Sequence, residues 1–313
     1  MPPMSHPQST TGASRSICVI LFLAALMAAP AFGTDISPMP TPLHVVSSGN
    51  SFSGGSVSAF DEITRLAGIK ASRAVYSGIG GSRVIQHWDL PDDKNVAKKA
   101  LLEGNVDVMT MNPIFMPDEG IAKFVKFGLE KNPKMRFAIQ QSWLIRDQRG
   151  TPETEVLYSK RNYKKLDPNS RTGDEIRKEY EPVFKALEDH VRELNKQVGR
   201  DVLFIIPIGR ASILLREKII AKQAPGLDSQ NALFDARNGV RDEMCHPSGV
   251  LTTLGGYCYY ATIYRQSPAG LPVPTNLSKM KPSEQEKLNR LLQELAWQAV
   301  TEHPQSGVKA EAK

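Results

Sequence analysis

The chain reads Leu43-His44-Val45-Val46-Ser47-Ser48-Gly49-Asn50-Ser51-Phe52 from residue 43 to residue 52. The apolar run at 43–46 is typical of a buried strand, and the small polar residues after it are typical of a loop. The residues that follow predict a helix whose apolar side chains repeat every three positions: Val57, Phe60, Ile63 and Leu66. The stretch therefore predicts a strand, a tight loop that contains a serine, and a helix.

The same alternation continues along most of the chain. Four more apolar runs predict strands, at residues 74–76, 106–111, 136–143 and 202–208. Helical patterns lie between them. Strands that alternate with helices form right-handed βαβ units, and helices then cover both faces of a parallel sheet. We therefore expect a three-layer α/β/α fold of flavodoxin-like character, with a mainly parallel five-stranded sheet.

The first 33 residues have the pattern of a secretory signal. Arg15 precedes an uncharged apolar run at 17–29, which is short for a bilayer span, and small residues at 31–33 suit cleavage. An uncleaved membrane anchor is the alternative for this segment. We expect a signal peptide at 1–33, a secreted or periplasmic protein, and no stable membrane insertion of the mature chain.

The rest of the chain is expected to form a single domain over residues 34–303, with a disordered tail at 304–313. Residues 144–199 are predicted to be an insertion between the fourth and fifth strands. Its second half predicts a long amphipathic helix, and Pro182 inside the pattern predicts a kink or a new helix start. This helix either covers the sheet or forms a substrate lid.

Composition excludes several classes of protein. Of 313 residues, 41% are apolar and 23% are charged, as in ordinary globular domains. The net charge of +6 comes from scattered lysines and arginines, so no nucleic-acid partner is expected. No Cys-x-x-Cys or His-Glu-x-x-His spacing occurs, and we expect neither a metal nor another cofactor. Cys245 and Cys258 can either pair or stay free.

Residues that can carry chemistry follow three of the predicted strands. Ser51 follows the first strand, the glycine-rich segment 78–81 follows the second, and Asn112 follows the third. His246 lies late in the chain, before a helical segment rich in tyrosine. Open parallel sheets bind ligands at the carboxyl ends of their strands, so we expect the three strand-end segments to meet at one edge.

Together, and in this order, these segments resemble the SGNH (GDSL-like) serine hydrolase family. Residues 49–52 resemble its first sequence block, residues 78–81 its second, residues 110–113 its third, and His246 its last. The resemblance spans about residues 43–272, with a looser match over the insertion.

The match to these blocks has departures. Asn50 replaces the aspartate of the first block, Thr110 replaces the glycine of the third, and Pro113 replaces the final acid of the third. The segment 204–216 is similar to one found in bacterial members of planctomycete type. These departures leave the serine, glycine, asparagine and histidine markers of the family in place.

The resemblance implies a serine hydrolase mechanism. Ser51 would be the nucleophile and His246 the base that takes its proton. The backbone N–H groups of Ser51 and Gly81, together with the side-chain amide of Asn112, would hold the oxyanion.

The group that orients His246 stays open at this point. In the family an acid usually lies three residues before the histidine, which is Glu243 here, and Asp242 lies one residue earlier. The two acids are equal candidates, and a backbone carbonyl is a third. Another histidine, His87, either lines the site or packs within the fold.

The function implied by the resemblance is hydrolysis of acyl esters outside the cytoplasm. Acetyl or other short acyl groups on small molecules or carbohydrates are the expected substrates. The alternative is a non-catalytic binding or scaffold protein that keeps the fold without turnover. A phosphate-binding flavodoxin-like protein is a third reading, although neither glycine loop has P-loop or dinucleotide spacing.

Overall fold

The computed structural model describes residues 42–69, 73–148 and 166–310. All of them fall in one compact unit that spans Thr34–Lys313. The signal peptide expected at 1–33 lies outside the described residues. So does most of the polar first half of the insertion expected at 144–199.

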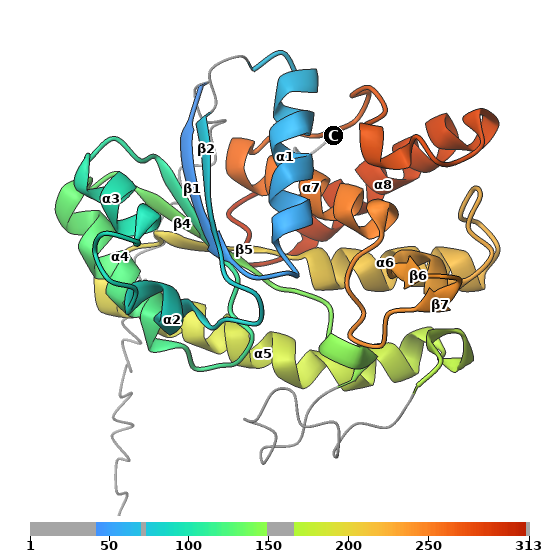
Figure 1. The fold of residues 1–313 in the computed structure, drawn as a ribbon, viewed down its shortest axis with the longest axis horizontal. Helices are drawn as coiled ribbons and strands as arrows, with labels where there is room; N and C mark the ends of the chain where they lie inside the picture. The colour runs from blue at the N-terminus through green and yellow to red at the C-terminus, as the bar shows by residue number, and fades with distance from the viewer. Residues whose placement is uncertain (1–41, 70–72, 149–165, 311–313) are drawn as a thin grey trace, which may run out of the picture. The chain divides into compact units, whose positions relative to one another are not determined.

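Five parallel strands form the central sheet (Figure 1). They are β1 (His44–Gly49), β2 (Arg73–Gly78), β3 (Val108–Met111), β4 (Arg136–Gln140) and β5 (Leu203–Ile206). Their spatial order is β2-β1-β3-β4-β5, which is the flavodoxin-like order. Because β1 lies between β2 and β3, its carboxyl end is next to the carboxyl ends of both neighbours.

Helices cover both faces of this sheet, which confirms the predicted three-layer fold (Figure 1). One face is covered by α1 (Gly54–Leu66), α6 (Ile208–Ile220), α7 (Gly249–Tyr264) and α8 (Pro282–Glu302). The other is covered by α2 (Val84–Trp88), α3 (Val96–Leu102), α4 (Glu119–Lys131) and the second half of α5 (Gly173–Val198). Neighbouring strand residues point to opposite faces, so Val45 joins the first apolar cluster and Val46 the second.

Short elements complete the described part of the chain. They are the hairpin β6 (Ala236–Arg237) and β7 (Val240–Arg241) and the 3₁₀ turns η1 (Ile145–Asp147), η3 (Pro168–Ser170), η4 (Gln230–Leu233) and η5 (Thr275–Leu277). Asn238 and Gly239 join β6 to β7 with positive φ angles of 53° and 75°. Two such residues form the tight turn that antiparallel strands favour.

The long helix of the insertion, α5, runs without a break through Pro182. Thr172 and Glu175 cap its start reciprocally, and Gly199 ends it in the left-handed conformation. Its apolar stripe is buried along the whole length: Ile176, Tyr180, Phe184, Leu187, Val191 and Leu194. Capping at both ends and burial in the middle outweigh the local cost of the proline, so the predicted new helix start at Pro182 was wrong. The buried stripe makes α5 a sheet-covering helix.

The tail after His303 was predicted to be disordered, and over residues 304–310 that prediction was wrong. The backbone N–H of Ile205 in β5 donates to the Gln305 carbonyl at 2.8 Å. Ser306 and Val308 are buried. The tail thus covers the outer edge of β5, where unpaired backbone groups would otherwise face solvent.

None of the helices in the described ranges is long and apolar enough to cross a membrane.

Candidate active site

Ser51 lies in the turn between β1 and α1, at the carboxyl end of the sheet. The N–H groups of Ser53 and Gly54 both donate to the Asn50 carbonyl, at 3.0 and 3.2 Å, and so close this turn. Ser51 itself is exposed, whereas Asn50 and Phe52 on either side are buried. The turn therefore presents the serine hydroxyl to solvent from a fixed backbone.

Asn50 joins the loops that follow three strands. Its side-chain NH₂ donates to the Ser82 carbonyl at 3.1 Å and to the Asn112 carbonyl at 3.3 Å. Its side-chain oxygen accepts from the Phe52 N–H and from Asn112 Nδ2, both at 3.0 Å. A carboxylate could not donate to the two carbonyls, which gives a physical reason for asparagine at this position. The sequence showed Asn50 only as a departure from the family pattern and did not reveal this role.

The glycine-rich loop after β2 carries Gly81, with a φ of 65° that favours glycine. The N–H of Ile79 donates to the Gly49 carbonyl at 3.0 Å, so this loop lies against the end of β1. Over the described residues, the backbone N–H groups of Ser51 and Gly81 donate to no protein atom. Both are therefore available to a ligand.

Asn112 follows β3 and is buried beside Asn50. The Ser142 hydroxyl donates to its side-chain oxygen at 3.1 Å, and that hydroxyl in turn accepts from Gln140 Nε2 at 2.7 Å. These contacts fix which end of the amide is the oxygen. The NH₂ end therefore faces Asn50, and only one of its two protons is used there.

His246 lies opposite Ser51, although 195 positions separate the two residues in the chain. Its Nε2 is 3.0 Å from Ser51 Oγ, and its Nδ1 is 2.6 Å from Asp242 Oδ2. Because a carboxylate can only accept, a neutral ring carries its proton on Nδ1 and leaves Nε2 free to accept from the serine. The structure thus connects Ser51, His246 and Asp242 through two successive hydrogen bonds.

Asp242 also accepts from the backbone N–H of His246, at 2.9 Å. Partial burial raises the pKa of Asp242, but the hydrogen bonds from the His246 backbone and ring outweigh burial, so the pKa is lowered overall. Glu243, the other acid that the sequence offered, is exposed and lies 3.7 Å from Arg146. The structure therefore does not bring Glu243 to the histidine ring.

Aromatic side chains pack against the His246 ring. Phe52 lies between His246 and Trp143, with ring centroids 5.2 Å from each. Trp143 Nε1 donates to the Cys245 carbonyl at 2.8 Å. On the other side of this loop, the His246 carbonyl accepts from the Asp235 N–H at 2.8 Å. Neither Phe52 nor Trp143 was singled out from the sequence, because only the tertiary packing connects them to the histidine.

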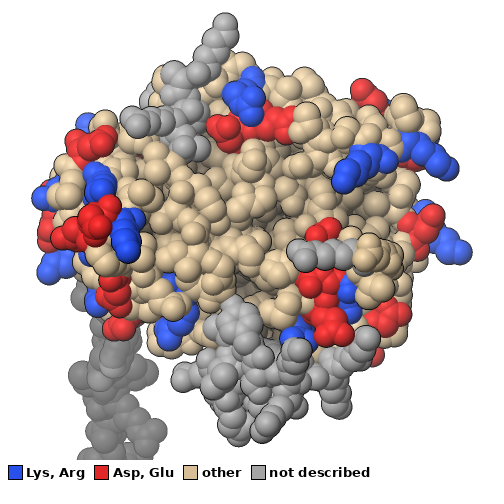
Figure 2. Space-filling view, in the orientation of Figure 1, with Lys and Arg blue, Asp and Glu red and all other residues tan. Residues whose placement is uncertain are grey.

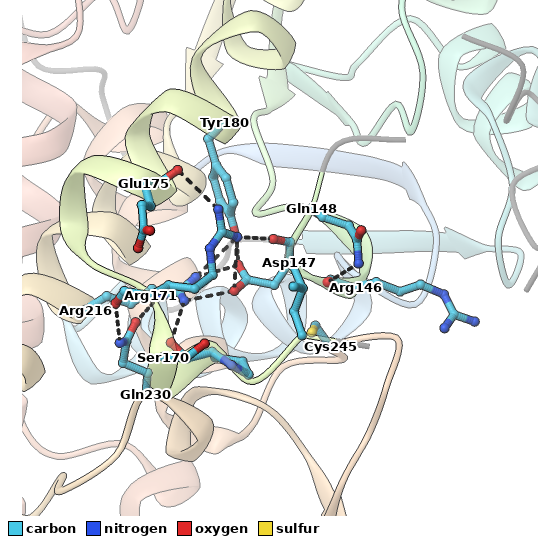
Figure 3. A network of polar contacts seen from close by, with 12 residues as sticks. Arg146, Asp147, Gln148, Ser170, Arg171, Glu175, Tyr180, Arg216, Gln230 and Cys245 are labelled. Atoms are coloured by element: carbon cyan, nitrogen blue, oxygen red, sulfur yellow. Dashed lines mark hydrogen bonds and ion pairs between the residues drawn. The ribbon is translucent and has the colours of Figure 1, made fainter. Parts of the chain in front are cut away.

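A buried polar network lies next to Cys245, the residue before His246 (Figure 3). Arg216 on α6 donates to both carboxylate oxygens of Asp147, at 2.5 and 2.9 Å. The Tyr180 hydroxyl donates to the same carboxylate at 2.5 Å, and Arg171 is also paired with it. Next to Asp147, the Arg146 N–H donates to the Met244 carbonyl at 3.2 Å. The network therefore connects α5 and α6 to the segment just before His246.

Cys245 and Cys258 are both free and buried. Burial raises the pKa of the Cys245 thiol to about 12, although Arg241 opposes the change. Thiols that stay protonated are poor nucleophiles. No group of three or more His, Cys, Asp and Glu side chains in the described part of the chain is arranged to hold a metal ion.

No protein-family model and no curated protein matches the chain. Among solved structures, the chain is similar to a candidate SGNH hydrolase from Slackia heliotrinireducens, with 13% sequence identity and a TM-score of 0.42. The match covers 71% of this chain and 100% of the other. At this identity and TM-score the likeness assigns no function to the chain.

Proposed function

We propose that the chain is a serine hydrolase that cleaves acyl esters, with Ser51 as its nucleophile. One observation carries this proposal: the His246 ring lies within hydrogen-bond distance of both Asp242 and Ser51. Its Nδ1 is 2.6 Å from Asp242 Oδ2, and its Nε2 is 3.0 Å from Ser51 Oγ. These separations match the distances at which a nucleophile, its base and an orienting acid work together. Ser51 is exposed, so a substrate can reach it.

The chemistry follows from the tautomer that Asp242 imposes on the ring. Ser51 Oγ attacks the ester carbonyl while His246 Nε2 takes the hydroxyl proton. His246 then returns that proton to the leaving alcohol, which departs and leaves an acyl group on Ser51. The same nitrogen then takes a proton from water as the water oxygen attacks the acyl carbon, and returns it to Ser51 Oγ as the acid leaves. Asp242 stabilises the imidazolium that forms in each half of the cycle.

The negative oxygen of each tetrahedral intermediate needs hydrogen-bond donors. We assign this role to the Ser51 N–H, the Gly81 N–H and the Asn112 side-chain amide. The two backbone groups have no acceptor among the described residues, and the amide has one unused proton. Donors that are held in place before the reaction need no reorganisation when the charge develops.

The substrates we propose are esters of acetyl or other short acyl groups, with small molecules or carbohydrates as the alcohol part. Figure 2 shows Lys and Arg side chains next to Asp and Glu side chains around the margin of the face that it presents, with mainly uncharged residues at its centre. Such a mixed surface does not favour a polyanion, which agrees with an uncharged ester as substrate. Export of the protein is part of the same proposal and rests on the leader pattern at 1–33.

A fluorophosphonate probe tests this function directly, because it forms a covalent bond only with an activated serine. We expect the mature protein to be labelled at Ser51, with labelling abolished in Ser51→Ala and strongly slowed in His246→Ala. Glu243→Gln serves as the matched control and should be labelled like the wild type. A panel of acyl esters assayed with the same proteins would then identify the acyl length.

Absence of both labelling and ester hydrolysis in folded wild-type protein would contradict the enzymatic proposal. It would favour the binding or scaffold protein that keeps this fold without turnover. Labelling at another serine would contradict the assignment of Ser51 but not the class of enzyme.

A further inference from the structure

His87 is buried in α2 and contacts two serine hydroxyls. Its Nε2 is 2.6 Å from Ser82 Oγ, and its Nδ1 is 3.4 Å from Ser77 Oγ. Only 1% of the residue is exposed. A neutral imidazole has one donor and one acceptor, and a hydroxyl can serve as either. Because the Ser82 hydroxyl donates its proton to the Ile79 carbonyl, it accepts from Nε2–H, and the Ser77 hydroxyl is left to donate to Nδ1.

The ring is kept neutral by its surroundings. Burial lowers the pKa of His87 to about 4, although a hydrogen bond to the backbone of Gly49 raises it. At neutral pH the ring is uncharged and can act as a fixed hydrogen-bonding group rather than as a cation. Ser77 and Ser82, which the ring contacts, lie in β2 and in the loop after it, and that loop presents Gly81, one of the proposed oxyanion donors.

Ser82 links His87 to the proposed oxyanion site. Its hydroxyl donates to the Ile79 carbonyl at 2.9 Å, beside a longer bond of 3.3 Å from its own N–H, and the two bonds close the turn that contains Gly81. Its carbonyl accepts from Asn50 Nδ2 at 3.1 Å. The Gly80–Gly81 peptide, which carries the Gly81 N–H, lies inside this turn, so a shift of Ser82 that opens the turn would change the direction of that N–H.

The helix that carries His87 is itself held rigidly. Asp118, buried at the start of α4, accepts from the N–H groups of Val84 and Ile85 at 2.7 and 3.0 Å. Asn95 Nδ2 donates to the His87 carbonyl at 2.8 Å. Gly120 lets α4 approach so closely that a Cβ at this position would lie 2.3 Å from the Ile85 nitrogen. These contacts fix the position of the short helix and, with it, the position of the imidazole.

We propose that His87 is a positioning residue for the oxyanion site: it holds the Ser82 hydroxyl and thereby fixes the direction of the Gly81 N–H. This inference rests on the proposed function. It assigns His87 no contact with the substrate, so its effect should fall on the chemical step and not on substrate binding.

The test compares His87→Leu with His87→Gln, in which the amide nitrogen can replace Nε2. With a chromogenic short-chain ester, His87→Leu should lower kcat about tenfold with KM within about twofold, since losing one oxyanion donor outright costs about 10²–10³. His87→Gln should restore kcat to within about threefold of the wild type, because it keeps a hydrogen bond to Ser82. His44→Gln, at the other end of β1, is the matched control and should leave kcat unchanged.

Ser82→Ala removes the same contact from the other side and keeps the test decisive if His87→Leu does not fold. It should lower kcat to a similar extent. The double variant with His87→Gln should lose no more than Ser82→Ala alone, because without the Ser82 hydroxyl residue 87 has no contact there to keep or to lose. Wild-type kcat in His87→Leu or in Ser82→Ala would overturn the positioning role. So would equal losses in His87→Gln and His87→Leu.

Fluorophosphonate labelling of the wild type separates this test from that of the function itself. A wild type that is labelled at Ser51, with variants that keep full kcat, overturns the role of His87 alone. A wild type that is neither labelled nor active overturns the proposed function, and the role of His87 with it.

Discussion

Two acidic side chains on neighbouring loops each pair with a basic partner, in opposite surroundings. Asp242 and His246 have side chains that are 27% and 37% exposed, whereas the Asp147 and Arg216 side chains are each 1% exposed. Burial lowers the pKa of Arg216, but its hydrogen bond to Asp147 and the nearby charges outweigh burial and raise it overall. The arginine therefore stays charged in its buried site.

The difference separates a working pair from a supporting pair. A buried pair with fixed charges cannot take part in proton transfer. Loss of one of its partners strongly destabilises the fold, because the other charge stays buried without compensation. A half-exposed pair contributes little to stability, and its partners can change protonation when a substrate reacts. We therefore expect changes to Asp242 to affect mainly activity, and changes to the Asp147 network to affect mainly stability.

The largest effect is expected from Asp242→Asn. The amide can donate to Nδ1 and so stabilise the tautomer that lacks a free Nε2, which costs about 10⁴-fold in a comparable triad. We expect kcat/KM to fall by about this factor, or about 5.5 kcal/mol of barrier, with a melting temperature close to that of the wild type. Kinetics with a short-chain ester and thermal unfolding measure the two quantities.

Glu243→Gln is the control for that variant, because Glu243 has the same charge and lies next to Asp242 in the chain. We expect it to keep kcat/KM within about threefold, as for most surface substitutions. A larger loss in Glu243→Gln than in Asp242→Asn would reverse the assignment of the orienting acid.

The choice between these two acids shows where prediction from the sequence stops. Alternation of apolar runs predicted the parallel sheet, and the strand ends predicted that Ser51, Gly81 and Asn112 follow neighbouring strands. Which acid meets the histidine depends on the backbone between them, where Cys245 has a φ of 62°. An ordinary residue with positive φ leaves no local signal in the sequence.

Asn50 and Trp143 were missed for a related reason. Each contributes through a contact with a residue that is distant in the sequence, and a single sequence gives no sign of such a pairing. The Asn238-Gly239 pair is different, because this dipeptide is a known signal for a tight hairpin turn and could have predicted β6 and β7. Local turn chemistry was therefore accessible from the sequence, whereas the network around the site was not.

The second effect in size concerns the buried pair of Asp147 and Arg216. Arg216→Met leaves the Asp147 carboxylate buried with Tyr180 and Arg171 only, and removing one partner of a buried pair costs about 3–5 kcal/mol. We expect a loss of this size in the free energy of unfolding, measured by urea denaturation. Lys185→Met, which breaks the exposed pair with Asp189, is the control and should cost about 0–1 kcal/mol.

A double variant sharpens this result. Asp147→Asn combined with Arg216→Met removes both charges, so it should be more stable than Arg216→Met alone. A single variant Arg216→Met that is as stable as Lys185→Met would show that the buried pair is not needed to hold the loop.

The third effect in size concerns the proposed oxyanion donors. Asn112→Ala removes the proposed side-chain donor to the oxyanion, and such a loss costs about 10²–10³ in kcat, or about 2.7–4 kcal/mol. We expect KM to change little, because the donor acts mainly on charge that develops during the reaction. Asn132→Ala, an amide that donates to the Val106 carbonyl away from the site, is the control and should keep kcat. Wild-type turnover in Asn112→Ala would remove Asn112 from the oxyanion site.

The smallest effect is the pH dependence of the contribution that Asp242 makes to stability. Its folded-state pKa is lowered, so the unfolded chain binds more protons in the range between the two pKa values. The contribution is therefore complete above the unfolded value of about 3.9 and is lost as the pH falls through the lower folded value. Because both partners are partly exposed, we expect at most about 1 kcal/mol.

Urea denaturation of wild type and Asp242→Asn from pH 3 to pH 7 should show that the difference between their free energies of unfolding shrinks at the acid end. The corresponding difference for Ser51→Ala, which keeps the acid, should stay constant. A difference between wild type and Asp242→Asn that grows toward pH 3 would contradict the direction of the shift, and with it the view that the histidine stabilises the charged form of Asp242.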